Sequence, residues 1–215
     1  MNAEHFAPFS ELAAQLLPHA IPNGLDGAHD IAHIARVWSN ARAIAAVEGG
    51  DQEVLLAATL LHDCVSVEKD SPDRARASSL AAAQARIYLE PLRWERAQTD
   101  AICHAIEAHS FSANIPPRTR EAQILQDADR LDAIGLIGVA RCFYVAGRMG
   151  SALYDPDDPR AQRRALDDRA YALDHFETKL LTLAEGFQTS EGRRMAAARH
   201  DELLSFRDAF LAQVS

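Results

Sequence analysis

The sequence predicts an all-α protein, a bundle of about seven or eight helices. Ala and Leu are abundant, aromatic residues make up only 7% of the 215 residues, and no segment shows the alternation of apolar and polar residues that marks a β-strand. Gly, Pro and polar residues gather in a few short segments typical of connections. These segments are 18–27, 48–51, 70–73, 110–117 and 147–159.

Helices are expected between these connections, in order along the chain. The expected ranges are 3–17, 28–47, 52–64, 73–90, 94–109, 119–147, 161–186 and 190–213. Asp51 is placed to cap the helix that begins at residue 52, since Val54 follows as its first apolar residue. The polar, turn-rich stretch 147–159 suits either a mobile loop over a site or a plain surface connection.

Length and cysteine content indicate one self-sufficient domain over residues 1–215. Domains usually hold roughly 100–200 residues, so one domain is expected and two small ones are the alternative. A chain of this length buries enough surface to fold without disulfides or a structural metal. Cys64, Cys103 and Cys142 are far apart and form no CxxC pair. This sparse set argues against a disulfide framework and against a cysteine zinc site.

Net charge and hydropathy limit the kinds of molecule that the protein is expected to bind. Lys and Arg number 22 against 31 Asp and Glu, a formal charge of −9 that argues against binding of polymeric nucleic acid. A local basic pocket for a small phosphate compound is still compatible with that balance. The first residues show no basic and apolar signal segment, and the longest apolar runs, 54–61 and 133–140, are less than half of a membrane span. We expect a cytoplasmic protein; nothing in the sequence indicates its oligomeric state.

Histidine and aspartate residues form a pattern that suits a metal ion. His29 and His33 are four residues apart and share a helix face, His62 and Asp63 end the apolar run LLAATLLHDC, and Asp129 lies in QDADRLDAIG. An imidazole and a carboxylate at the buried end of an apolar helix need partners, and a metal is one. Two His nitrogens and two Asp oxygens from three helices suit Mn²⁺, Fe²⁺, Co²⁺, Ni²⁺, Zn²⁺ or Mg²⁺, with positions left for water and substrate.

The same residues resemble the H…HD…D signature of the HD-domain metal-dependent phosphohydrolases. The resemblance spans roughly residues 29–183 and is strongest to a bacterial subgroup. It is carried by HDIAHIARV, AATLLHDCVSVEKDSP, ICHAIEAHSFS, ILQDADRLDAIGLIGVAR and HFETKLLTL, with a tail, FQTSEGRRMAAARHDELLSF, that is also similar. It implies the helical HD fold and cleavage of phosphate esters or anhydrides of nucleotides with a divalent metal. Some similar proteins split nucleoside triphosphates into monophosphate and pyrophosphate.

By this resemblance, His33, His62, Asp63 and Asp129 take the metal-ligand positions, with Mn²⁺ placed first among the ions. Asp127 competes with Asp129, but residues two apart on a helix differ by about 200° in direction, so only one faces the ion. Asp129 matches the last ligand of the signature. Asp127 then caps a turn or orients a ligand histidine.

The negative charge that develops on a phosphoryl group during reaction also needs cationic or proton-donating neighbours. The candidates are Lys69, His104, His109 and Arg130. His104 and His109 are separated by about 140° on one helix, so they do not easily bind one ion. At least one of them is expected to contact phosphate or to act as a general acid. Asp132 shares the face of Asp129 and belongs either to the surroundings of the ligands or to a salt bridge.

The protein is therefore expected to be an enzyme, a metal-dependent phosphohydrolase. Its expected partner is a small phosphate compound that serves as substrate, and a nucleoside triphosphate is favoured. Cleavage of phosphomonoesters or phosphodiesters would use the same ligands. A two-metal HD enzyme and a nucleotide-binding sensor without catalysis are further alternatives. The base is not specified: Phe111 and Tyr154 could stack on it or could be packing residues.

Overall fold

The computed structural model describes residues 2–21, 31–67, 76–110 and 113–214. This part of the chain forms nine α-helices and four short 3-10 helices, and its only β-type pairing is one isolated bridge between Ala152 and Tyr171. The prediction of an all-α protein is confirmed. Within the described ranges, no helix has both the length and the apolar character that crossing a membrane requires. The chain divides into two compact units, Met1–Asp129 and Arg130–Ser215, so that one domain over residues 1–215 stays a prediction.

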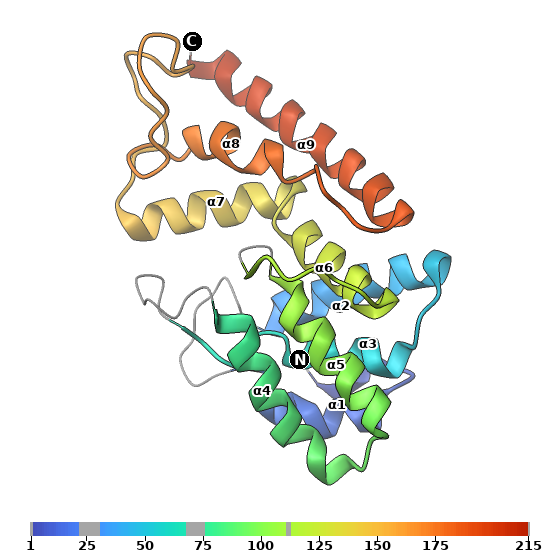
Figure 1. Ribbon diagram of the computed structural model, residues 1–215. Helices are drawn as coiled ribbons and strands as arrows, with labels where there is room; N and C mark the ends of the chain where they lie inside the picture. The colour runs from blue at the N-terminus through green and yellow to red at the C-terminus, as the bar shows by residue number, and fades with distance from the viewer. Residues whose placement is uncertain (1, 22–30, 68–75, 111–112, 215) are drawn as a thin grey trace. The chain divides into compact units, whose positions relative to one another are not determined.

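The first unit is built around one fully buried helix. Every residue of α3 (Gln52–Leu61) from Val54 onward is buried, and all of them except Thr59 are apolar, so the helix packs on all sides. Helices α1, α2 and α5 contact it, and α5 also packs along α4 (Figure 1). The bounds of these helices are α1 (Ser10–Leu16), α2 (Ile31–Glu48), α4 (Ala77–Leu89), α5 (Arg96–His109) and α6 (Arg120–Asp132).

The start of α3 is fixed by the predicted cap. Asp51 has an extended backbone, and its Oδ1 accepts hydrogen bonds from the backbone N–H groups of Glu53 at 3.0 Å and Val54 at 3.2 Å. The backbone N–H of Asp51 donates to the carboxylate of Glu121 on α6 at 2.8 Å. The cap therefore sets both where α3 begins and which side of α6 it meets.

The second unit contains α7 (Gly135–Met149), α8 (Asp174–Thr178) and α9 (Ser190–Val214). Helix α9 packs along α7, as Figure 1 shows. Phenylalanine rings from all three helices meet with centroids 5.8–6.1 Å apart, a spacing typical of aromatic clusters. The rings are those of Phe143, Phe176, Phe206 and Phe210.

The prediction of one helix over 119–147 is wrong, because the chain breaks between α6 and α7. Ile134 is extended, and Gly135 follows with φ +70°, a conformation that disfavours any residue with a side chain. At Gly138, an added Cβ would lie 2.4 Å from the carbonyl oxygen of Ala133. The turn therefore depends on two glycines that a helix-propensity argument treats only as weak positions.

The prediction of a helix over 161–186 is also wrong, since only α8 and the 3-10 turn Leu180–Thr182 form there. Carboxylates take the backbone groups that a helix would use. Asp158 accepts from the backbone N–H of Gln162 at 3.0 Å, and Asp174 accepts from the backbone N–H of Asp167 at 2.7 Å. Such local side-chain bonds offer the backbone an alternative to the helix.

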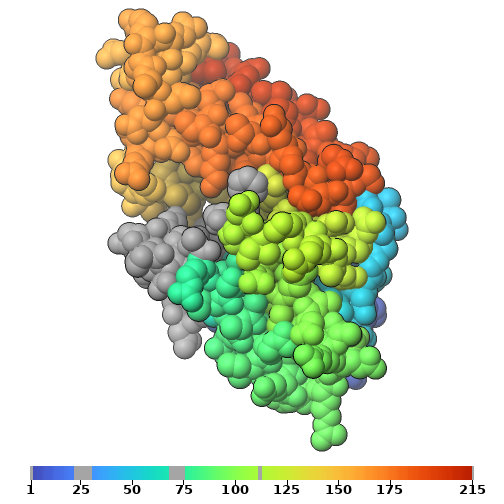
Figure 2. Space-filling view, viewed as in Figure 1, coloured from blue at the N-terminus to red at the C-terminus, as the bar shows by residue number. Residues whose placement is uncertain are grey.

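The connection after α7 is consequently longer than the predicted stretch 147–159. It runs from residue 150 to residue 173 without a helix and closes on itself through the Ala152–Tyr171 bridge. In the space-filling view this segment, gold to orange, forms a continuous surface with the rest of the second unit (Figure 2). Hydrogen bonds within the segment make it a packed connection of the second unit. This arrangement corresponds to the surface connection that the sequence analysis gave as the alternative to a mobile loop.

Candidate metal centre

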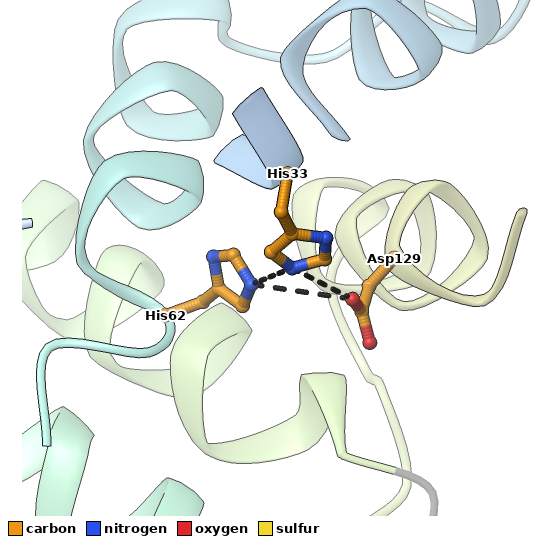
Figure 3. A group of neighbouring side chains, drawn as sticks. All are labelled: His33, His62 and Asp129. Atoms are coloured by element: carbon orange, nitrogen blue, oxygen red, sulfur yellow. Dashed lines mark hydrogen bonds and ion pairs between the residues drawn. The ribbon is translucent and has the colours of Figure 1, made fainter. Parts of the chain in front are cut away.

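The ligands implied by the resemblance converge in the first unit. His33 lies in the first turn of α2, His62 and Asp63 directly follow α3, and Asp129 lies in the last turn of α6. The Nε2 atoms of His33 and His62 are 3.3 Å apart, and Oδ1 of Asp129 lies 3.5 Å from the first and 4.0 Å from the second. Figure 3 shows these three side chains pointing toward one another. The expectation that three helices supply the cluster agrees with this geometry.

The two carboxylate oxygens of Asp63 lie near different histidines. Oδ2 lies 3.5 Å from Nε2 of His62 and 3.9 Å from Nε2 of His33, whereas Oδ1 lies 3.8 Å from Nε2 of His109. Among the described residues, two overlapping groups have the spacing of metal ligands. One is His33, His62 and Asp129, and the other is His62, Asp63 and His109.

Helix ends orient two of the imidazoles. The last carbonyl groups of a helix lack partners within it, and here each accepts a hydrogen bond from a ring. Nδ1 of His62 donates to the carbonyl oxygen of Thr59 at 2.7 Å, and Nδ1 of His109 donates to that of Ile106 at 2.6 Å. Because Nδ1 carries the proton, Nε2 of each neutral ring is an acceptor, the form in which imidazole binds metals.

These residues fit a divalent cation. Nε2 of His62, an acceptor when the ring is neutral, faces carboxylate oxygens of Asp63 at 3.5 Å and Asp129 at 4.0 Å, an arrangement in which acceptors oppose acceptors unless a positive charge joins them. The partial negative charge at the C-terminal ends of α3, α5 and α6 favours a cation at the same place. His33 and His62 are about 1% exposed, while the side chains of Asp63 and Asp129 are 34% and 29% exposed. The cluster is thus closed on the histidine side and open to water on the carboxylate side.

His109 is the predicted catalytic histidine that reaches the cluster. It is buried, and its ring centroid lies 5.0 Å from that of His62 in an edge-to-face arrangement. Burial and the neighbouring His62 hold the pKa of His109 below its ordinary value, against the opposing effect of Asp63 and Asp129. A lowered pKa keeps the ring neutral, so that Nε2 accepts protons and hydrogen bonds.

The other predicted catalytic residues lie elsewhere or outside the described ranges. His104 is half-buried on α5, and its Nε2 accepts a hydrogen bond from the backbone N–H of Arg118 at 3.0 Å, so the structure does not bring it into the ligand group. Lys69 and Phe111 lie outside the described residues. Roles for His104 and Lys69 stay predictions.

Arg130 is anchored within the second unit. Its guanidinium donates to the carbonyl oxygens of Glu185 at 2.9 Å and Gly186 at 3.0 Å, and it lies 5.3 Å from the ring centroid of Phe187. The side chain is 7% exposed. These contacts describe a residue that holds the chain before α9, and contact with phosphate stays a prediction.

The structure bears on three alternatives that the sequence analysis left open. Asp127 is fully buried and lies in neither ligand group, whereas Asp129 lies in one of them; the choice of Asp129 as the ligand stays a prediction. Asp132 forms an ion pair with Arg141 of α7 at 3.0 Å, which is the salt-bridge alternative. Tyr154 packs edge to face on Phe210, the packing alternative to base stacking.

Sequence reasoning missed two buried amides beside the ligands. Nδ2 of Asn40 donates to the carbonyl oxygen of Ala128 at 3.0 Å, and Nε2 of Gln126 donates to that of Ala108 at 2.7 Å. One signal was available: Asn40 follows His33 by seven residues, so both lie on one face of α2. The acceptors are backbone atoms distant in the sequence, which no local pattern reveals.

Comparisons with known proteins point to one family. The family model of the HD domain matches residues 30–134, a range that contains every residue of the two ligand groups. The uncharacterized protein YpgQ of Bacillus subtilis is 34% identical over 182 residues, which cover 83% of this chain and 80% of YpgQ.

Solved structures agree with this assignment. An HD-superfamily hydrolase from Bacillus thuringiensis superposes with a TM-score of 0.70 at 28% identity, covering 98% of this chain and 96% of that one. The structure of B. subtilis YpgQ in complex with ADP superposes with a TM-score of 0.69 at 28% identity and the same coverage. With the matching fold, the extended identity to YpgQ and the converging histidines and aspartates, this chain belongs to the HD-domain family, with the fold of the HD-superfamily hydrolases.

Proposed function

We propose that this protein is a metal-dependent phosphohydrolase that acts on nucleotides and splits a nucleoside triphosphate into monophosphate and pyrophosphate. The observation that carries the proposal is the convergence of ring nitrogens and carboxylate oxygens on one point, between His33, His62, Asp63 and Asp129. These four residues are proposed to hold one divalent ion of the kind that accepts mixed nitrogen and oxygen donors, with Mn²⁺ placed first among the candidates.

The chain's own residues prepare the site for hydrolysis. When bound, the ion supplies a lowered pKa for water and a contact for a phosphoryl oxygen. Thr59 fixes the ring of His62 through its carbonyl oxygen, and the exposed sides of Asp63 and Asp129 leave a path for substrate. The closed histidine side excludes water from behind the ligands.

His109 is proposed as the proton acceptor. Its Nε2 is unprotonated and lies 3.8 Å from Oδ1 of Asp63, whose side chain is 34% exposed. In the proposed step a water oxygen forms a bond to the α-phosphorus, its proton passes to Nε2 of His109, and the bond from the α-phosphorus to the bridging oxygen breaks. Pyrophosphate leaves with the electron pair of that bond. It is a charge-stabilised leaving group, so the step needs no strong acid.

A nucleotide is proposed as the substrate because of chemistry and similarity together. A polyphosphate needs positive charge in a protein of formal charge −9, and Lys69 is proposed to supply part of it. The similar YpgQ has been crystallised with ADP, which supports a nucleotide as partner here. The proposal does not need Arg130, whose guanidinium contacts backbone carbonyls.

Product analysis tests the proposal. The Mn²⁺-loaded protein is incubated with each of the common nucleoside triphosphates, and the products are separated by ion-exchange chromatography. Monophosphate with pyrophosphate is expected in equal amounts. Diphosphate with inorganic phosphate would contradict the choice of bond, while hydrolysis of phosphomonoesters alone would favour the phosphomonoesterase alternative.

Two variants show whether the measured hydrolysis comes from this protein and depends on its metal site. His62→Ala is expected to lose bound metal and activity together, with one ion per chain found by elemental analysis in the wild type. Asp100→Asn is a suitable inert control, because Asp100 is half-exposed and pairs with Arg86 on the surface of the first unit. Binding of a nucleotide by the wild type without turnover under any metal would favour the sensor alternative.

A further inference from the structure

The residues of the proposed site come from helices that must keep a fixed position along one another. His33 lies on α2, His109 on α5 and Asp129 on α6, so sliding of one helix separates them. One residue of a helix spans about 1.5 Å, whereas a site of this kind tolerates about 0.5 Å. Apolar contacts between helices have no direction and resist such sliding poorly, whereas hydrogen bonds between helices fix their register.

Asn40 ties α2 to α6 at the peptide group before Asp129. Its Nδ2 donates to the carbonyl oxygen of Ala128 at 3.0 Å, and the side chain is 5% exposed. Asn40 and His33 are seven residues apart, two helical turns, and therefore share one face of α2. The face that presents His33 to the cluster thus also holds the backbone that presents Asp129.

Gln126 ties α6 to α5 in the same manner. Its Nε2 donates to the carbonyl oxygen of Ala108 at 2.7 Å, and it is also 5% exposed. Ala108 precedes His109 at the end of α5, where carbonyl groups lack helical partners. A shift of α6 would leave both a buried amide donor and a carbonyl group without this bond, which is unfavourable.

We propose that Asn40 and Gln126 are positioning residues of the metal centre, which fix α6 between α2 and α5 through the peptide groups next to Asp129 and His109. This inference rests on the proposed function, since it concerns the same site. Neither amide belongs to the proposed ligands or to the groups proposed to meet substrate. Their effect is therefore expected on the affinity and geometry of the bound ion, beyond any effect on stability.

Isosteric variants of the full chain test the proposal. Asn40→Leu and Gln126→Met keep the volume and remove the donor. Mn²⁺ affinity is measured by calorimetry, and the visible spectrum of bound Co²⁺ at saturating concentration reports the arrangement of its ligands. Each variant is expected to bind Mn²⁺ about 10–100-fold more weakly, the range known for residues that orient ligands. The Co²⁺ spectrum is expected to change in both.

Ile44→Val provides the matched control. Ile44 is fully buried on α2, one turn beyond Asn40, and donates no hydrogen bond from its side chain. This variant is expected to lower the melting temperature while leaving the Mn²⁺ affinity and the Co²⁺ spectrum as in the wild type. Should Asn40→Leu fail to fold, Asn40→Ser keeps a donor of shorter reach, and it is expected to weaken Mn²⁺ binding in the same direction.

The outcomes are distinguishable. Folded Gln126→Met and Asn40 variants with wild-type Mn²⁺ affinity and an unchanged Co²⁺ spectrum would overturn the inference and leave the proposed function intact. A wild-type protein that binds neither ion would overturn the proposed function, and this inference with it. Equal losses of affinity in Ile44→Val and in the amide variants would mean that stability alone controls the site, which also overturns the inference.

Discussion

Replacing Asp129 by Asn separates the charge of the proposed ligand from its shape. Oδ1 of Asp129 lies 3.5 Å from Nε2 of His33 and 4.0 Å from Nε2 of His62. A cation that joins these atoms lies near the carboxylate. Two unit charges about 4 Å apart interact by about 4 kcal/mol at an effective dielectric constant of 20, and a divalent ion interacts with a carboxylate about twice as strongly. Since the side chain is 29% exposed, water weakens this interaction, and we expect Asp129→Asn to bind the ion about 100-fold more weakly.

The expected effect on thermal stability follows from mass action. At a free metal concentration of 100 times Kd, binding stabilises the wild type by about 2.7 kcal/mol, or roughly 5–10 °C in Tm for a chain of this length. A 100-fold weaker site at the same concentration retains about 0.4 kcal/mol, about 1 °C. The measurement is the melting temperature by differential scanning fluorimetry over a Mn²⁺ titration, with the chelated protein as reference.

Asp127→Asn is the discriminating comparison, because Asp127 competes for the same role two residues earlier. It is fully buried and outside the ligand groups, so its variant is expected to keep more of the Mn²⁺-induced shift than Asp129→Asn. The assignment of Asp129 as the ligand would be refuted if Asp129→Asn kept the wild-type Mn²⁺-induced rise in melting temperature. It would also be refuted if this rise were smaller in Asp127→Asn than in Asp129→Asn. The exposed Asp100→Asn should behave as the wild type.

Further predictions concern thiol reactivity, pH and the turn between α6 and α7. Burial, with a smaller effect of the neighbouring negative charge, raises the pKa of Cys64 to about 12, so this thiol should resist alkylation at pH 8 until the protein is unfolded, as mass spectrometry would detect. Because the pKa of His109 is lowered in the folded protein, the unfolded chain binds more protons at low pH. The unfolding free energy of the ion-free protein should therefore fall as pH drops below about 6.5. In urea titrations, His109→Gln should reduce this dependence of the unfolding free energy on pH, and an unchanged dependence would contradict the prediction. Gly138→Ala should destabilise by about 1–3 kcal/mol, because its Cβ would lie 2.4 Å from the carbonyl oxygen of Ala133, whereas Gly147→Ala in the same helix meets nothing within 4 Å and should stabilise by about 0.5–1 kcal/mol in the same urea assay.

The parts of the fold that depend on local chemistry were predictable from the sequence. The apolar run before His62 marks a buried helix, and Asp51 caps it as expected. The two helices that were predicted wrongly each have a cause of their own. In 119–147 and 161–186 the deciding interactions are a backbone approach at Gly138 and carboxylates that bind backbone groups, and helical propensity accounts for neither.

For the site, the sequence predicted the ligand types and the structure adds their orientation. The angle of about 140° between His104 and His109 implies that one ion does not take both, and only His109 lies in a ligand group. Arg130 follows Asp129 in the sequence, yet its guanidinium contacts carbonyl groups at residues 185 and 186. Adjacency along a helix therefore predicted proximity for Arg130 but gave no information about the partner that its side chain finds.

The geometry of the centre links binding to folding. His62 and His109 each use Nδ1 to satisfy the end of a helix, which commits Nε2 to the role of acceptor. The carboxylates that face these nitrogens are acceptors as well, so the cluster without a cation places like partial charges within 4 Å of one another. The same feature that makes the ion-free cluster unfavourable makes a cation bind well, because the ion relieves the repulsion. Substitutions such as Asp129→Asn that relieve it without an ion should stabilise the ion-free protein, or leave its stability unchanged, while weakening the site, which is the trade between stability and function expected of residues kept for chemistry.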